Sequence, residues 1–225
     1  MLDPSNMRYH LNTFRYEAES SLRALYALRQ FSTLLTDQKS VNELNKNVHF
    51  WKIFESALTT KLYIGIRRLY DSGGDTFTIQ SFIKHCIDGV SQFSSAELRK
   101  RKMAGSANAS QWIEGFMKDT CEPTADDFKA LARLVRENSE RMKGLYTDIA
   151  SKVYAHAIHT DAENIFQLSQ GVNFDEIEKA LTSIWHVYQQ VWQMYENGRK
   201  PDLNIAIYPY INEVAGSINQ QLISK

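Results

Sequence analysis

The stretch Lys152-Val-Tyr-Ala-His156, continued by Ala-Ile-His159-Thr-Asp161, holds the residues of this chain that are best suited to chemistry. An imidazole with an ordinary pKa of about 6.5 exchanges protons near neutral pH, so His156 could act as a general base. Lys152 and Asp161 add charges of both signs to the same short stretch. The residue types therefore indicate a nuclease-like acid–base site at this segment.

The histidine segment could also serve as a metal site or have a purely structural role. A nucleophilic triad has no support, because Cys86 and Cys121 stand in no nucleophile context and the chain has no Gly-x-Ser-x-Gly elbow. His156 and His159 are three residues apart and would share a helical face, with Asp161 as an oxygen ligand for zinc. Since no further cysteine or histidine is nearby, we expect no metal. A structural role would make His156 a hydrogen-bonded core residue and His159 a surface one.

Length, charge and cysteine content suggest an ordinary cytoplasmic protein. The 225 residues are enough for one well-buried core, and the 26 acidic and 26 basic residues give no net field toward nucleic acid or membrane. Two separate cysteines without a signal peptide suggest a reducing compartment. No apolar run approaches the roughly 18 residues of a membrane span. We expect a single domain over residues 1–225, with a core at about 5–197 and a C-terminal extension at 198–225.

The hydrophobic spacing predicts an all-α bundle of about five to seven helices. Only four prolines interrupt the chain, and apolar residues recur every three or four positions in several long segments. The expected helices run over about 5–36 and 48–70, then from caps at Thr78, Thr124 (with Asp127) and Asn173 (with Glu176). Their apolar stripes include Phe14, Ala18, Ser21, Leu25, Leu28 and Leu35; Phe50, Phe54, Ala57, Leu58, Leu62, Ile66 and Leu69; Phe128, Leu131, Val135, Met142, Leu145 and Ile149; and Phe174, Ile177, Leu181, Ile184, Tyr188, Val191 and Tyr195.

Two features of this pattern are ambiguous. Residues 93–122 look like an irregular insertion, and their basic run Arg99–Lys102 favours a solvated face, because it lacks interleaved aromatic residues. Trp185 and Trp192 widen the apolar face of the helix that begins after Asn173. That face could be buried within the chain, or it could be a self-association surface, since aromatic residues are enriched at interface cores.

Three motifs together resemble one known family. Lys152-Val-Tyr-Ala-His156, Leu62-Tyr-Ile-Gly-Ile-Arg-Arg-Leu-Tyr-Asp71 and Phe77-Thr-Ile-Gln-Ser-Phe82 are similar to the HEPN superfamily, in its branch named for abortive infection of phage-attacked bacteria. The similarity spans about residues 48–195. It implies an all-α bundle that forms a homodimer with the His156 segments near the two-fold axis. Active members cut RNA without metal or cofactor.

The chain departs from that family at its arginine. The active pattern is an arginine followed by four to six residues and a histidine, but Ile149, Ala150 and Ser151 occupy the corresponding positions. Lys152 is a point charge and cannot replace the bidentate guanidinium on a phosphate. Arg67 or Arg68 could converge on the site from the helix over 48–70.

Two functions therefore stay open. One is a dimerising module of a prokaryotic defence or toxin–antitoxin type system, with degenerate nuclease activity, that binds RNA, a nucleotide or an antitoxin-type protein. The other is an active metal-independent ribonuclease with His156 as general acid/base and Lys152 beside it. In either case the binding residues would be Tyr154, His159, Asp161, Arg67 and Arg68.

Overall fold

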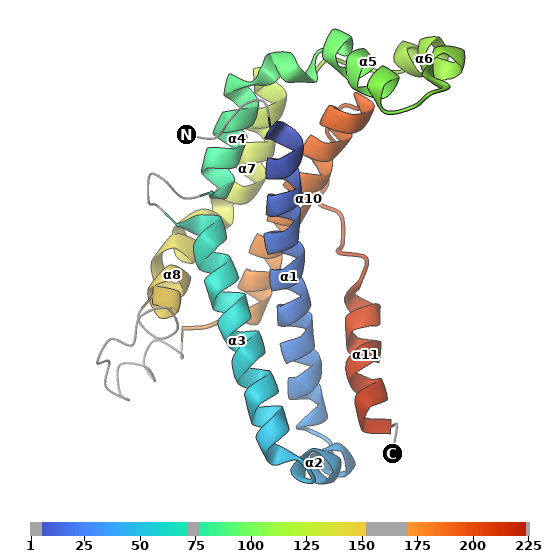
Figure 1. The fold of residues 1–225 in the computed structure, drawn as a ribbon. Coiled ribbons are helices and arrows are strands. Elements are labelled where there is room, and N and C mark those ends of the chain that lie inside the picture. Colours follow the sequence, from blue (N-terminus) through green and yellow to red (C-terminus); the bar gives the residue numbers. More distant parts are fainter. Residues whose placement is uncertain (1–5, 72–76, 152–170, 224–225) are drawn as a thin grey trace.

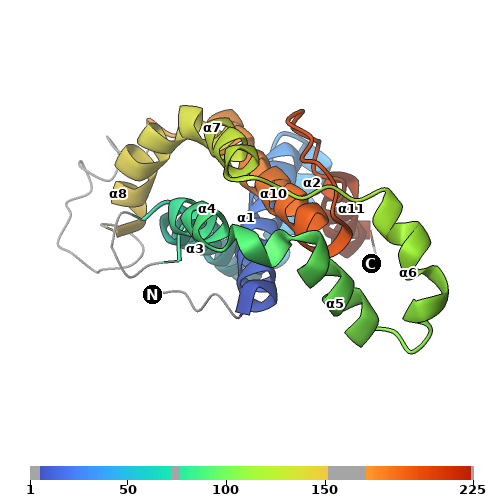
Figure 2. The same ribbon diagram turned by 90° about the horizontal axis from the view of Figure 1, so that it is seen from above.

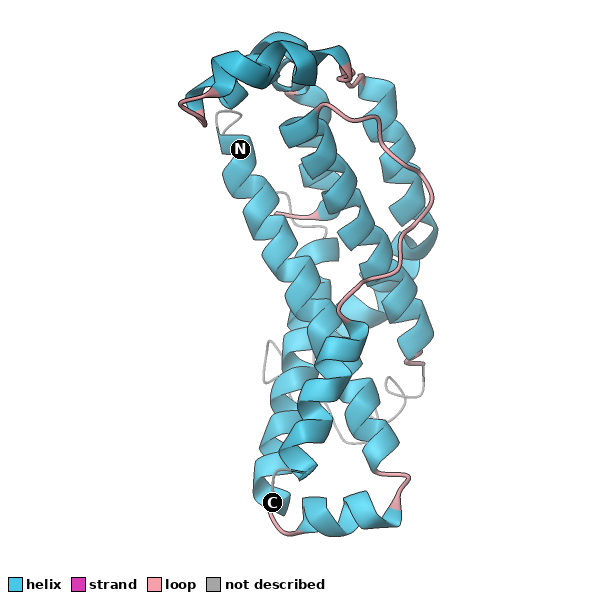
Figure 3. Cartoon of the chain, turned by 90° about the vertical axis from the view of Figure 1, so that its right-hand side faces the viewer, coloured by secondary structure: helices cyan, strands magenta, loops and turns pink. Residues whose placement is uncertain are grey.

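The computed structural model describes residues 6–71, 77–151 and 171–223, and the regular elements in these ranges are all helices (Figures 1 and 3). The described residues form ten α-helices, more than the five to seven expected, together with two short turns of other helix types. In chain order the elements are α1 (Met7–Leu34), α2 (Gln38–Asn45), α3 (Val48–Tyr70), α4 (Ile79–Asp88), η2 (Val90–Phe93), α5 (Ser95–Ala104), α6 (Ala109–Lys118), α7 (Ala125–Arg141), η3 (Met142–Tyr146), α8 (Thr147–Ile149), α10 (Phe174–Asn197) and α11 (Ile211–Ile223).

Three long helices, α1, α3 and α10, form the body of the bundle, and α7 and α4 pack on its upper half (Figure 1). The stripe of α1 from Phe14 to Leu28 is buried, as its spacing predicted. The two helices α1 and α3 approach each other closely where Ser21 faces Gly65: a Cβ added to Gly65 would lie 2.0 Å from Ser21 Oγ. Small residues at this crossing therefore set the distance between α1 and α3.

The expected helix starts are confirmed by their capping bonds. Thr78 accepts a hydrogen bond from the Ser81 amide, and the Ser81 hydroxyl accepts one from the Thr78 amide, which completes a capping box at α4. At α7, the Asp127 carboxylate accepts from the Thr124 amide at 2.7 Å and from the Thr124 hydroxyl at 2.9 Å. Asn173 caps α10 by accepting from the amides of Asp175 and Glu176.

The prediction of an irregular insertion at 93–122 is wrong, because this region folds into a hairpin of α5 and α6. The hairpin stands off from the bundle at the end of α10 (Figure 2). Arg99 binds both carboxylate oxygens of Glu114 at 2.6 and 2.8 Å, and Leu98 is buried. Arg101, also in the basic run, lies 3.9 Å above the Tyr195 ring and anchors the hairpin to α10. α5 has few apolar positions and so little periodicity, whereas α6 carries Trp112, Ile113, Phe116 and Met117 at three-to-four spacing but is only ten residues long.

The outer ends of the predicted stripes are also corrected. Phe50, Ala57 and Leu35 are exposed, although the spacing placed them in the core. The N-terminal half of α3 extends beyond the main core, and only a small separate cluster of Phe31, Leu44 and Trp51 forms there. Periodicity identifies the side of a helix that is apolar, but the length over which a partner covers that side depends on packing.

The broad aromatic face of α10 is covered by the C-terminal part of the same chain. Trp185 is only 6% exposed, and its ring packs edge-on against Tyr208, which is itself buried. His186 fixes the extended segment before α11, because its Nε2 donates to Asp202 O at 2.8 Å and its Nδ1 accepts from the Ala206 amide at 3.3 Å. The aromatic face is thus accounted for within one chain. Among the described residues, no helix combines the length and apolar character that crossing a bilayer requires.

Candidate functional site

The histidine segment lies outside the described residues. Lys152, Tyr154, His156, His159 and Asp161 all fall within 152–170. Their assignment as a site, and the zinc alternative on two of the histidines, therefore stay predictions. The described residues on either side show how the chain leads into and out of this segment.

The helix that leads into the segment changes its winding. α7 continues into a π-helical turn, η3, before α8, and the Thr147 hydroxyl binds Met142 O across this turn at 2.6 Å. Beyond Met142, the buried face continues through Tyr146, Ile149 and Ala150, whereas Leu145 is only half-buried.

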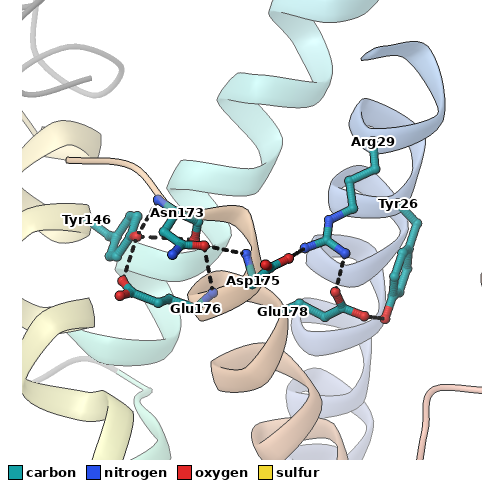
Figure 4. A network of polar contacts seen from close by, with 7 residues as sticks. All are labelled: Tyr26, Arg29, Tyr146, Asn173, Asp175, Glu176 and Glu178. Atoms are coloured by element: carbon teal, nitrogen blue, oxygen red, sulfur yellow. Dashed lines mark hydrogen bonds and ion pairs between the residues drawn. The ribbon is translucent and has the colours of Figure 1, made fainter. Parts of the chain in front are cut away.

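The two ends of the segment are held together by one tyrosine (Figure 4). Tyr146 is fully buried, and its hydroxyl accepts a hydrogen bond from the Asn173 amide at 2.9 Å. The same hydroxyl donates toward Asn173 O at 3.3 Å or toward the Glu176 carboxylate at 3.2 Å. The described residues before and after the segment therefore meet at Tyr146 and the first turn of α10.

A second polar cluster ties the start of α10 to α1 (Figure 4). Arg29 forms ion pairs with Asp175 and Glu178, and the Tyr26 hydroxyl donates to Glu178 at 2.7 Å. Burial, followed by this hydrogen bond to a carboxylate, raises the pKa of Tyr26. Carboxylates in the first turn also suit the positive end of the α10 dipole. The first turn of α10 is thus held by Tyr146 on one side and by α1, through Tyr26 and Arg29, on the other.

Two of the three positions where the family pattern would place its arginine belong to the core, and the third, Ser151, is half-buried. Ala150 is 0% exposed and is part of the main hydrophobic cluster, with Ile149 beside it. A guanidinium at position 150 would have to be buried, which is costly for an unpaired charge. At position 150 this chain therefore has a small side chain packed in the core, where the family pattern has a charged one.

Arg67 and Arg68 lie in the last turn of α3, which packs against η3 and α8. Arg68 is exposed and binds Glu17 of α1 at 2.8 Å, a carboxylate that it shares with Lys61. Arg67 is half-buried, and within the described residues its guanidinium makes no hydrogen bond or ion pair. Of the two candidates, Arg67 is the one whose cation is not already used to join α1 and α3.

Among the described residues, no three histidine, cysteine or acidic side chains gather as metal ligands would. Cys86 is buried, and burial raises the pKa of its thiol, which disfavours the reactive thiolate. Cys121 is exposed and far along the chain from Cys86. The described polar residues beside the histidine segment are therefore positively charged or hydrogen-bonding side chains, and not a cluster of metal ligands.

The comparison with known families agrees with this architecture and with the three motifs. The family model for AbiU2, in the HEPN superfamily, matches residues 8–215. The chain belongs to the AbiU2 family. No curated protein and no solved structure matches it. The expected family is therefore confirmed, and the AbiU2 match extends beyond the predicted span of 48–195 to include α1 and the start of α11.

Of the two residues that join the ends of the histidine segment, only Asn173 can be predicted from the sequence. The Asn173 cap has a local signature, because the capping residue and Glu176 are three positions apart. Tyr146 has none, since its partners are 27 and 30 residues away. The apolar spacing alone favours Leu145 on this face, although Tyr146, four residues after Met142, continues the same face.

Proposed function

We propose that this AbiU2-family protein acts in abortive infection by binding RNA, and does not cleave it by a metal-independent reaction. The observation that carries the proposal is the burial of Ala150 in the core. The pentavalent, phosphorane-like transition state of RNA cleavage gains negative charge, and losing one preorganised donor typically costs about 10²–10³ in rate. A buried methyl group supplies no such donor.

The second candidate is an active ribonuclease in which His156 moves the proton and a cation from elsewhere meets the phosphate. The position of Arg67 favours it, because α3 packs against η3 and α8 and the Arg67 guanidinium has no partner within the described residues. Lys152 would add a second, more mobile positive charge.

Incubation of the purified protein with RNA in EDTA separates these candidates. We expect no cleavage by the parent protein. Cleavage that is lost in both His156→Ala and Arg67→Gln, but kept in Arg68→Gln, would refute the proposal and establish the second candidate. Arg68→Gln is the matched control, since it removes the same group from the adjacent residue, whose partner is Glu17. Ala150→Arg is unsuitable as a gain-of-function variant, because the position is packed.

We also propose that the protein forms a homodimer and has an antitoxin-type protein partner, as the family resemblance implies. The aromatic face of α10 does not support the dimer, because Tyr208 covers Trp185. Phe50 and Ile53 on α3 support it instead, being 51% and 70% exposed, since such apolar surface is typical of interaction sites. Sedimentation across micromolar concentrations should give a dimer in the parent and a monomer in Phe50→Ser/Ile53→Ser. A monomeric parent would remove this proposal.

A further inference from the structure

A groove with a volume of about 570 Å³ lies between α4 and α7. Its floor is aliphatic: Ile83 and Ile87 come from α4, and Ala132 and Val135 come from α7. None of the described residues that line it is aromatic. The groove thus has no ring on which a base could stack, so its recognition chemistry must lie in the charged rim.

Among the described residues, the rim of the groove carries five cations. Lys129, Arg133, Arg136 and Lys143 lie along one stripe of α7 and its continuation, and Lys84 stands on the opposite wall. Successive cations on this stripe are four, three and seven residues apart, which is about 6, 4.5 and 10.5 Å along a helix axis. The cations therefore form a linear array, which fits a chain of phosphates better than a single phosphate group.

The charges on this rim are largely available to a ligand. Lys84 pairs with Asp88 and Lys129 with Asp126, at 2.7 and 2.8 Å, but both are solvent-exposed pairs of a kind worth only about 0–1 kcal/mol. Arg133, Arg136 and Lys143 make no side-chain hydrogen bond or ion pair within the part of the chain that is described. Of the described residues that line the groove, Glu140 alone carries a carboxylate.

We propose that the groove between α4 and α7 holds the phosphate backbone of RNA. This inference rests on the proposed function, because it places the surface that binds RNA. Without aromatic residues or a set of amide side chains at the rim, the contacts would be to phosphates and would not depend on base sequence. An acidic protein segment is less favoured, since the floor residues Ile83 and Val135 are already buried and leave little apolar surface for a docked helix.

The number of phosphate contacts in the groove predicts how steeply RNA affinity falls with salt. Between three and five phosphate contacts predict a slope of log K against log salt of about −2 to −3.5 for a single strand. The affinity for a labelled single-stranded RNA should therefore fall about 20- to 120-fold from about 50 to 200 mM salt. The measurement is fluorescence anisotropy in EDTA, with two unrelated RNA sequences that should bind equally.

The decisive variant is Arg133→Gln/Arg136→Gln/Lys143→Gln. Its salt slope should be smaller in magnitude by about 2, because three contacts are lost. Lys52→Gln/Lys118→Gln/Lys200→Gln is the control: it removes the same charge from exposed positions on α3, on α6 and after α10, and should bind like the parent. Equal melting temperatures would establish that both variants are folded.

The outcomes separate the groove from the proposed function. RNA binding that is unchanged in the groove variant, or absent in the parent, overturns the groove proposal. Binding of an acidic peptide without binding of RNA overturns it as well and identifies a protein site. Cleavage of the RNA in EDTA would instead refute the proposed function, and a reduced salt slope in the groove variant would still support the groove.

Discussion

Tyr146→Phe tests whether the ends of the histidine segment are held together as described. The phenyl ring keeps the packing of the fully buried tyrosine, so only the hydroxyl is removed. The bond from the Asn173 amide at 2.9 Å is a neutral one worth about 1 kcal/mol. The bond toward Glu176 involves a charge but is longer, at 3.2 Å, and Asn173 is exposed enough to regain water. We therefore expect a loss of about 1–2 kcal/mol in the free energy of unfolding.

Urea unfolding followed by circular dichroism measures this loss. The midpoint should fall with an unchanged m-value, and the melting temperature should drop by about 2–8 °C for a chain of this size. Backbone amides of Asn173 and Glu176 should exchange faster with solvent. Tyr9→Phe is the control, since Tyr9 is mostly exposed and should show no change. A variant as stable as the parent, with unaltered exchange at these amides, would refute the proposed role of the hydroxyl.

Two further predictions address the bundle and the hairpin. Gly65→Ala should destabilise the fold by about 1–3 kcal/mol, because the new Cβ would lie 2.0 Å from Ser21 Oγ and 3.2 Å from Ser21 Cβ. Gly216→Ala, with nothing within 4 Å, should instead be neutral or stabilising in the same unfolding assay. The pKa of Glu114 is lowered by its hydrogen bond to Arg99, so this pairing holds above the ordinary carboxylate pKa and is lost as pH falls through the lowered value. An NMR titration should show the Glu114 pKa rising in Arg99→Gln, and an unshifted pKa would contradict the pairing.

The parts of the fold that the sequence predicted correctly are those determined locally. The bounds of α3 follow from an apolar period interrupted by Asp71 and the glycines after it, and the caps at Thr78 and Asn173 are pairs three residues apart. The α5–α6 hairpin was not predictable in this way. Its helices are short, and they are joined by the pairing of Arg99 with Glu114, 15 residues later, which no local pattern reveals.

The candidate site illustrates a different limit. The sequence shows that no arginine stands at 149–151, and a missing charge at an exposed position would be easy to restore. Only the packing reveals that Ala150 is enclosed by the core, because apolar spacing does not show which neighbouring elements cover a given position. The consequence of the substitution thus depends on the tertiary neighbours of position 150.

The comparison of Arg67 with Arg68 decides between binding and catalysis, because the two side chains differ in the ion pairs that they would lose on binding a phosphate. At the C-terminal end of α3 both are favoured by the helix dipole, by about 0.3–1 kcal/mol. Arg68 would also have to leave Glu17, whereas Arg67 has no ion pair to break within the described residues. A phosphate near the end of α3 would therefore recruit Arg67 first. Cleavage that depends on Arg67 would mean that the cation comes from a different helix than in the family pattern. RNA binding without cleavage would mean that packing at Ala150 has removed the catalytic step but has left the RNA-binding surface intact.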